Sequence, residues 1–136
     1  MSLSHHGGPA PGTVLAWLDP AASAHGWRIG VDVEDLRSPT VTRWADPRTR
    51  AEVDAVAFSE DEQRSLAQAR EPVIARVTQW CAKEAAVKAL GTGFTGDPAA
   101  VSTQVPGMVL RPLDTGDQHL IGVVALWWSP AASHSR

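Results

Sequence analysis

The feature of this 136-residue sequence that most restricts its fold is a long helical pattern that begins at Pro72 and stops at Gly91. Proline suits the first turn of a helix, and glycine suits the left-handed position just past its end. Apolar side chains recur between them at helical spacing, at Val73, Val77, Trp80, Cys81, Val87 and Leu90. The sequence therefore predicts one helix of about five turns with an apolar stripe to bury.

The segments around this helix are predicted to be strands and two shorter helices. The expected strands are residues 13–18, 27–34, 100–105, 108–113 and 119–128. Of these, 13–18 and 27–34 are expected to pair as a hairpin. Asp46 before Pro47, and Ser59 with Glu62 three residues later, are typical helix starts. Strands, then helices, then strands indicate an α+β fold with an antiparallel sheet packed against the long helix.

Composition limits the class of protein. A chain of 14.5 kDa predicts one domain, residues 1–128, followed by a flexible tail at 129–136. The net charge of -3, with dispersed arginines, argues against a nucleic-acid surface, and the longest apolar run is too short to span a membrane. The single cysteine, Cys81, cannot form an internal disulfide, so we expect a buried thiol and a cytoplasmic protein.

Lysine is used sparingly in this chain. Only Lys83 and Lys88 occur, both close to Glu84 in the long helical pattern, whereas ten arginines are spread over the rest of the sequence. A lysine ammonium is a compact, strongly hydrated point charge, unlike the planar head group of arginine. This distribution favours a phosphate-binding site. The simpler explanation is that Glu84 and Lys88, four residues apart, form an ordinary ion pair on a helix surface.

Two carboxylates about fifty residues earlier complete the candidate site. Asp32 and Glu34 would share one face of a strand, about 7 Å apart, while Val31 and Val33 face the core. Together with Glu84 they would offer three carboxylates, the oxygen ligands that magnesium takes alongside substrate phosphates. Taken alone, however, an Asp-x-Glu pair at the end of a strand is more often a solvated edge.

The segments taken together resemble the signature motifs of the 4′-phosphopantetheinyl transferases. These are residues 30–34 (GVDVE), 58–62 (FSEDE) and 80–91 (WCAKEAAVKALG), with residues 2–5 (SLSH) at the N-terminus. The order of the motifs is that of the surfactin-synthetase-activator type. That type is usually about twice as long and has two similar halves, so the resemblance implies a half-fold.

The resemblance implies a magnesium-dependent enzyme that transfers 4′-phosphopantetheine from coenzyme A to a serine of an acyl or peptidyl carrier protein, as in fatty acid or polyketide biosynthesis. It implies that Asp32, Glu34 and Glu84 hold the metal. Lys83 and Lys88 would neutralise the phosphates, His5 would contact a coenzyme A phosphate, and Glu84 is the candidate base beside Lys88.

The missing half implies a partner. We expect a homo-oligomer, with a trimer favoured, assembled through an apolar surface drawn from Trp17, Trp127 and Trp128; the alternative is a domain of a larger polypeptide. Two other functions remain open at this point. One is a non-catalytic assembly module with a degenerate transferase fold. The other is a metal-dependent nuclease, whose usual Glu-x-Lys spacing differs from that of Glu84 and Lys88.

Overall fold

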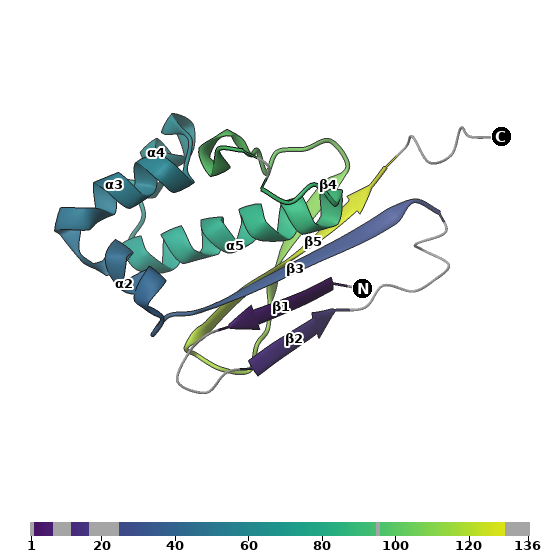
Figure 1. Ribbon diagram of the computed structural model, residues 1–136, viewed down its shortest axis with the longest axis horizontal. Helices are drawn as coiled ribbons and strands as arrows, with labels where there is room; N and C mark the ends of the chain where they lie inside the picture. Colours follow the sequence, from purple (N-terminus) through teal and green to yellow (C-terminus); the bar gives the residue numbers. More distant parts are fainter. Residues whose placement is uncertain (1, 7–11, 17–24, 95, 130–136) are drawn as a thin grey trace.

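This computed structural model describes residues 2–6, 12–16, 25–94 and 96–129, with side chains from residue 25 onward. Their strands form a pair, β1 (Ser2–His6) with β2 (Gly12–Ala16), and an antiparallel sheet in the order β3-β5-β4. In that sheet β3 is Trp27–Asp35, β4 is Met108–Leu113 and β5 is Leu120–Trp128. The long helix α5 (Pro72–Leu90) packs on β3 and β5 (Figure 1). The predicted α+β class is confirmed.

The helices begin and end where their capping residues predict. Asp46 caps α3 (Pro47–Ala57), and Ser59 forms a capping box with Glu62 at the start of α4 (Glu60–Leu66). Gly91, with φ of 73°, closes α5 in the left-handed conformation that glycine adopts without strain. The sequence reading missed α2 (Pro39–Ala45), although Ser38 followed by proline is the same kind of start signal.

Two predictions about strands are wrong. Residues 12–16 pair with β1 rather than with β3, whose partner is β5. The connection from β1 to β2 is shorter than that from β2 to β3. Closing the shorter loop costs less conformational entropy, which favours the observed pairing of β1 with β2. Residues 101–105 form no strand; a 3-10 turn, η1 (Pro98–Ala100), precedes them. The predicted tail lies, for residues 130–136, outside the described residues.

The core lies between α5 and the sheet. Small side chains on one stripe of α5, at Cys81, Ala85 and Ala89, are at most 1% exposed, and they belong to the same cluster as Val123 and Ala125 of β5. Small residues let the helix axis approach the strands closely, so the packing there is dense. Aromatic side chains fill the wider space toward α2, where Trp44 stacks on Phe58.

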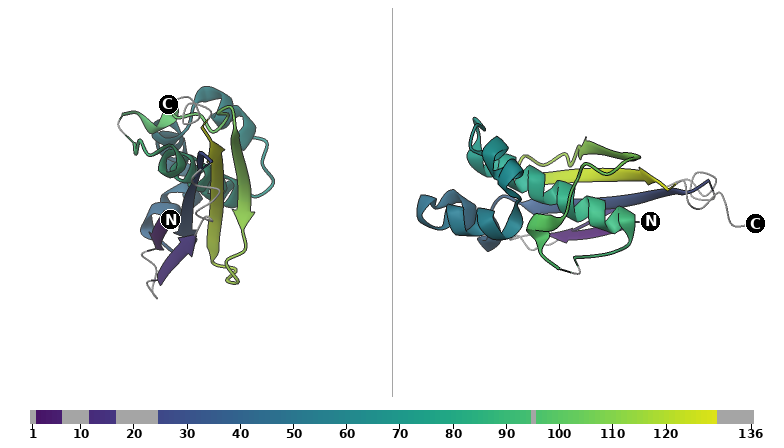
Figure 2. Two further views of the ribbon diagram at one scale, coloured as in Figure 1. Left: turned by 90° about the vertical axis from the view of Figure 1, so that its right-hand side faces the viewer. Right: turned by 90° about the horizontal axis from the view of Figure 1, so that it is seen from above.

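The helices gather on one side of the sheet (Figure 2). The β1–β2 pair lies beside β3, on the side away from β4, as the same views show. Cross-strand pairs such as Val31 with Val124 and Val109 with Leu126 belong to the sheet face turned away from α5. No helix in the described residues is long and apolar enough to cross a membrane.

Candidate active site

The site is built where α5 crosses β3. A Cβ atom at Gly30 would lie 1.9 Å from the carbonyl oxygen of Ala85, so only glycine allows this approach. Side chains alternate along a strand, so Asp32 and Glu34 share the face of Gly30 and point toward α5. Val31 and Val33 are buried as expected, but on the opposite face of the sheet.

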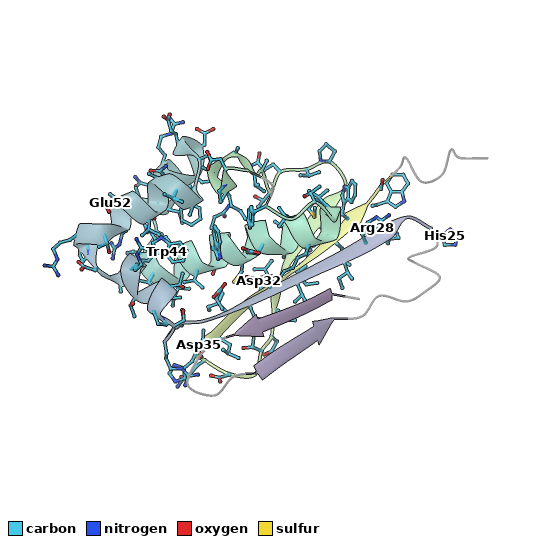
Figure 3. The ribbon with its side chains drawn as sticks, viewed as in Figure 1. His25, Arg28, Asp32, Asp35, Trp44 and Glu52 are labelled. Carbon is cyan, nitrogen blue, oxygen red and sulfur yellow. The ribbon has the colours of Figure 1, made fainter. Side chains whose placement is uncertain are left out.

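Lys88 connects the helix to the strand at this crossing. Its ammonium nitrogen lies 3.0 Å from Asp32 Oδ1 and donates a second hydrogen bond, also 3.0 Å, to the carbonyl oxygen of Val31. Asp32 is 5% exposed and lies between β3 and α5 (Figure 3). Lys88 is therefore bound to the strand carboxylate, and it is not merely a surface partner of Glu84.

The other two carboxylates belong to the same electrostatic unit. Burial and then the negative charges of Asp32 and Glu84 raise the pKa of Glu34 to about 7, while Lys88 and a hydrogen bond with Trp80 act in the opposite direction. Burial and then Asp32 raise the pKa of Glu84, again against Lys88. Charged groups shift one another's pKa values in this way only when they lie close together. We call Asp32, Glu34 and Glu84 the carboxylate cluster.

The donor chemistry of the carboxylate cluster fits a magnesium ion. Three carboxylates face a single ammonium there, so the cluster carries excess negative charge that a divalent cation would balance. Within the described residues, no group of three or more His, Cys, Asp or Glu side chains is placed so that it could hold a metal ion by itself. Substrate phosphate oxygens and water normally complete the coordination of this ion.

Lys83 does not join the carboxylate cluster. It is 0% exposed, and its ammonium lies 2.7 Å from Glu62 Oε2. It also donates hydrogen bonds to the carbonyl oxygens of Ala57, at 3.0 Å, and Pro98, at 2.8 Å. The sequence brought Lys83 and Lys88 together as two phosphate ligands, but their ammonium groups serve different parts of the structure.

His5 lies on β1, the strand next to β3. Its backbone therefore lies close to the strand that carries Asp32 and Glu34. The position of its imidazole lies outside what the structure describes. The same is true of Trp17, which the sequence placed on an apolar surface. Of the other two tryptophans, Trp127 packs partly against the core, whereas Trp128 is 41% exposed.

Sequence reasoning missed an aromatic wall beside the site. The ring of Trp80 stacks on Phe94, with centroids 5.5 Å apart and planes 12° apart, and its edge meets Trp44. It also missed the buried ion pair of Arg76 with Asp54, at 2.8 Å, which joins α5 to α3. An arginine within the apolar spacing of a helix was the available signal for that pair.

Comparisons with known proteins agree with this arrangement. The ACPS family model, described as 4′-phosphopantetheinyl transferase superfamily, matches residues 28–112, which include β3 except its first residue, α5 and the carboxylate cluster. No curated protein sequence matches the chain significantly. A solved structure, holo-[acyl-carrier-protein] synthase (AcpS) from Neisseria meningitidis, shares the fold with a TM-score of 0.58 and 20% identity, over 75% of this chain and 98% of that chain. The chain belongs to the 4′-phosphopantetheinyl transferase superfamily.

Proposed function

We propose that this chain transfers 4′-phosphopantetheine from coenzyme A to a serine of an acyl or peptidyl carrier protein, releasing 3′,5′-adenosine bisphosphate. The observation that carries the proposal is the meeting of Asp32, Glu34, Glu84 and Lys88 from β3 and α5. Family membership supports the transfer of a phosphopantetheinyl group. It gives no support to the nuclease alternative.

Lys88 is the residue that we assign to the phosphates. Two of the three N–H groups of its ammonium are directed at Val31 and Asp32, which fixes the direction of the third. We assign that third donor to an oxygen of the coenzyme A pyrophosphate. Negative charge accumulates on these oxygens during transfer, and a prepositioned ammonium stabilises it without reorganisation.

Glu84 is the proposed general base. The pKa of its carboxyl is raised, chiefly by burial, and a base with a higher pKa holds an abstracted proton more firmly. In the proposed step Glu84 takes the hydroxyl proton of the carrier serine. The serine oxygen forms a bond to the β-phosphorus, and the bond from that phosphorus to the bridging oxygen breaks, so 3′,5′-adenosine bisphosphate leaves with the bond electrons.

Asp32, Glu34 and Glu84 are the residues that would hold magnesium. When bound, magnesium would supply positive charge beside the pyrophosphate and so complement Lys88. We assign His5 of β1 to a phosphate of coenzyme A, as the family motif implies. Lys83 is left out of this ligand set, because its three N–H groups are directed at oxygen atoms of the chain itself.

We further propose that the chain works in the cytoplasm as a homo-oligomer, with a trimer favoured over a place in a larger polypeptide. Support comes from the sheet face turned away from α5, where Val109 is 37% exposed and Trp128 is 41% exposed. A coenzyme A molecule is long compared with one crossing of a strand and a helix. A neighbouring subunit would supply the second wall of its cleft.

The experiment that tests the function is intact-mass analysis of carrier proteins after incubation with this chain, coenzyme A and magnesium. We expect the mass of one phosphopantetheinyl group to be added to the carrier serine, and no addition when coenzyme A is omitted. Glu84→Gln should abolish the addition. Glu52→Gln, on an exposed position of α3, is the matched control and should be silent.

A folded chain that binds coenzyme A but modifies no acyl or peptidyl carrier protein would contradict the proposal. That result would favour the non-catalytic assembly module. Full activity in Glu84→Gln would leave transfer itself intact as the function but would remove Glu84 from its proposed role.

A further inference from the structure

Lys83 is the most completely buried positively charged side chain in the described part of the chain. Its side chain is 0% exposed, and its ammonium lies 5.7 Å from the centre of the Phe58 ring. A lysine ammonium has three N–H donors and no acceptor. Its three oxygen partners, Glu62 Oε2, Ala57 O and Pro98 O, lie between 2.7 and 3.0 Å away. These contacts account for the full donor capacity of Lys83.

Each of the three partners belongs to a different segment of the chain. Ala57 is the last residue of α3, Glu62 lies in the first turn of α4, and Pro98 begins η1. Lys83 thus fastens three segments to α5 at the residue immediately before Glu84. Glu62 is itself held, because it accepts hydrogen bonds from the backbone of Ser59 and from the Gln79 side chain.

The attachment at Pro98 also bears on the segment that follows α5. Gly91 fixes the near end of this segment through its hydrogen bonds to the last turn of α5. Phe94, within it, stacks on Trp80, whose side chain acts to lower the pKa of Glu34 in the carboxylate cluster. Lys83 holds the far end at Pro98. The aromatic wall of the candidate site is therefore secured on both sides, and Lys83 provides one of the two attachments.

We infer that Lys83 is a positioning residue of the transferase site rather than a ligand of coenzyme A. This inference rests on the proposed function. Its role is to keep η1 and the segment bearing Phe94 in place beside Trp80, so that Glu34 and Glu84 are presented to the substrate in one fixed arrangement. Glu62, the charged partner of this ammonium, also lines a cavity of about 340 Å³ between α4, α5 and residues 99–104.

The test compares Lys83→Met, Glu62→Gln and the double variant with the wild-type chain. Glu62→Gln leaves the buried ammonium of Lys83 without its charged partner, and Lys83→Met does the same to the partly buried Glu62, so each should lower the melting temperature by about 10 °C or more. The double variant removes both charges and should lose less than the sum of the two. Arg64→Met, which breaks an exposed ion pair with Asp61 on α4, is the matched control.

The decisive measurements are made on the double variant, well below its melting temperature. We expect its dissociation constant for coenzyme A to stay within about threefold of wild type, since no phosphate contact is removed. We expect kcat for carrier modification to fall at least tenfold, and hydrogen exchange to accelerate at the amides of Ala100 in η1 and of Val101, which caps η1. A purely structural role would leave kcat of the folded molecules unchanged.

Two further results would overturn the inference. One is coenzyme A binding weakened tenfold or more in the folded double variant, as expected for Lys88→Met, which would make Lys83 a phosphate ligand. The other is a double variant whose melting temperature falls by the full sum of the single changes. A wild-type chain without transfer activity would contradict the proposed function instead, and the melting temperatures and hydrogen exchange would still test the attachment.

Discussion

At the scale of single residues, the candidate site is defined by how few positive charges face its carboxylates. Lys88 bonds directly to Asp32, and Glu34 and Glu84 remain with raised pKa values. An enzyme that binds pyrophosphate together with a divalent cation benefits from this imbalance, because the cation is attracted before the substrate arrives. The two predictions at this scale concern the ammonium of Lys88 and the negative charge of Glu34.

Lys88→Arg should lower kcat/KM for carrier modification at least tenfold. The point charge of lysine lies 3.0 Å from both Val31 O and Asp32 Oδ1, and a planar guanidinium cannot occupy that position without moving outward. Steady-state kinetics with varied coenzyme A measure the loss, and Arg43→Lys on the exposed surface of α2 serves as the control. Nearly wild-type kinetics for Lys88→Arg would mean that only a diffuse positive charge is needed.

Glu34→Gln should raise the melting temperature at pH 8 in buffer containing a chelator. The folded chain holds the pKa of Glu34 near 7, above its ordinary value of 4.5, so the unfolded chain releases this proton first as the pH rises. The unfolded state then binds fewer protons, and stability falls between about pH 4.5 and 7. The variant lacks this loss, and the two proteins should converge near pH 4. Parallel curves from pH 4 to 8 would contradict the raised pKa.

At the scale of elements, the crossing of β3 and α5 determines whether a site can form. The contact brings the backbone of the helix against the strand, and all residues of the carboxylate cluster belong to these two elements. How closely β3 and α5 pack therefore determines the position of every proposed metal ligand.

Gly30→Ala should destabilise the fold severely, because the new methyl group would lie 1.9 Å from Ala85 O and 2.6 Å from Ala89 N. Separating helix and strand to relieve this overlap would cost at least about 3 kcal/mol of unfolding free energy. Urea denaturation measures the change. Gly96→Ala, where nothing lies within 4 Å of the added carbon, should be neutral. Equal stability of both variants would show that the crossing is loose.

The sequence predicted the elements whose signals are local. Caps at Asp46 and Ser59, the spacing of apolar residues in α5 and the final glycine all act within a few residues, so their outcome could be anticipated. The pairing of β2 depended on which of β1 and β3 it joins, and no local pattern records that competition. The face of β3 that receives α5 depended on Gly30, whose role is visible only once the helix is in place.

The candidate site shows the same division between what could and could not be anticipated. Asp32, Glu34, Glu84 and Lys88 could be proposed from motif and spacing, and the structure brings them together. The separate position of Lys83 could not, because Ala57, Glu62 and Pro98 are distant in sequence and two of the contacts are to backbone oxygens. Backbone acceptors leave no trace in side-chain patterns.

At the scale of the whole molecule, the sheet has two unequal faces. One is covered by α5, and the other carries apolar residues from β3, β5 and β4, of which Val109 and Trp128 are exposed. Exposed apolar side chains gathered on one face of a sheet favour association with another subunit. The proposed homo-oligomer would use this face.

Light scattering over a concentration series should detect self-association, with a trimer as the expected species. Val109→Asp should shift the population to monomers and reduce transfer activity in proportion, because a charge on this face opposes burial. Val56→Asp on α3, a site that is 65% exposed, is the matched control and should change neither. A strict monomer with full activity would contradict the shared site, and an inactive monomer would favour an excised half of a larger enzyme.

Because Cys81 is buried, the reaction of its thiol with a reagent in solution measures how often α5 separates from the sheet. This thiol, the only one in the sequence, is 0% exposed, and its sulfur lies 3.5 Å from Ile121 O, between α5 and β5. Burial raises the pKa of the thiol far above its ordinary value, so the reactive thiolate is suppressed while α5 stays on the sheet. Each molecule labelled by a thiol reagent must first have separated these elements. Labelling rates would therefore follow, without any engineered cysteine, how coenzyme A or a second subunit holds the helix in place.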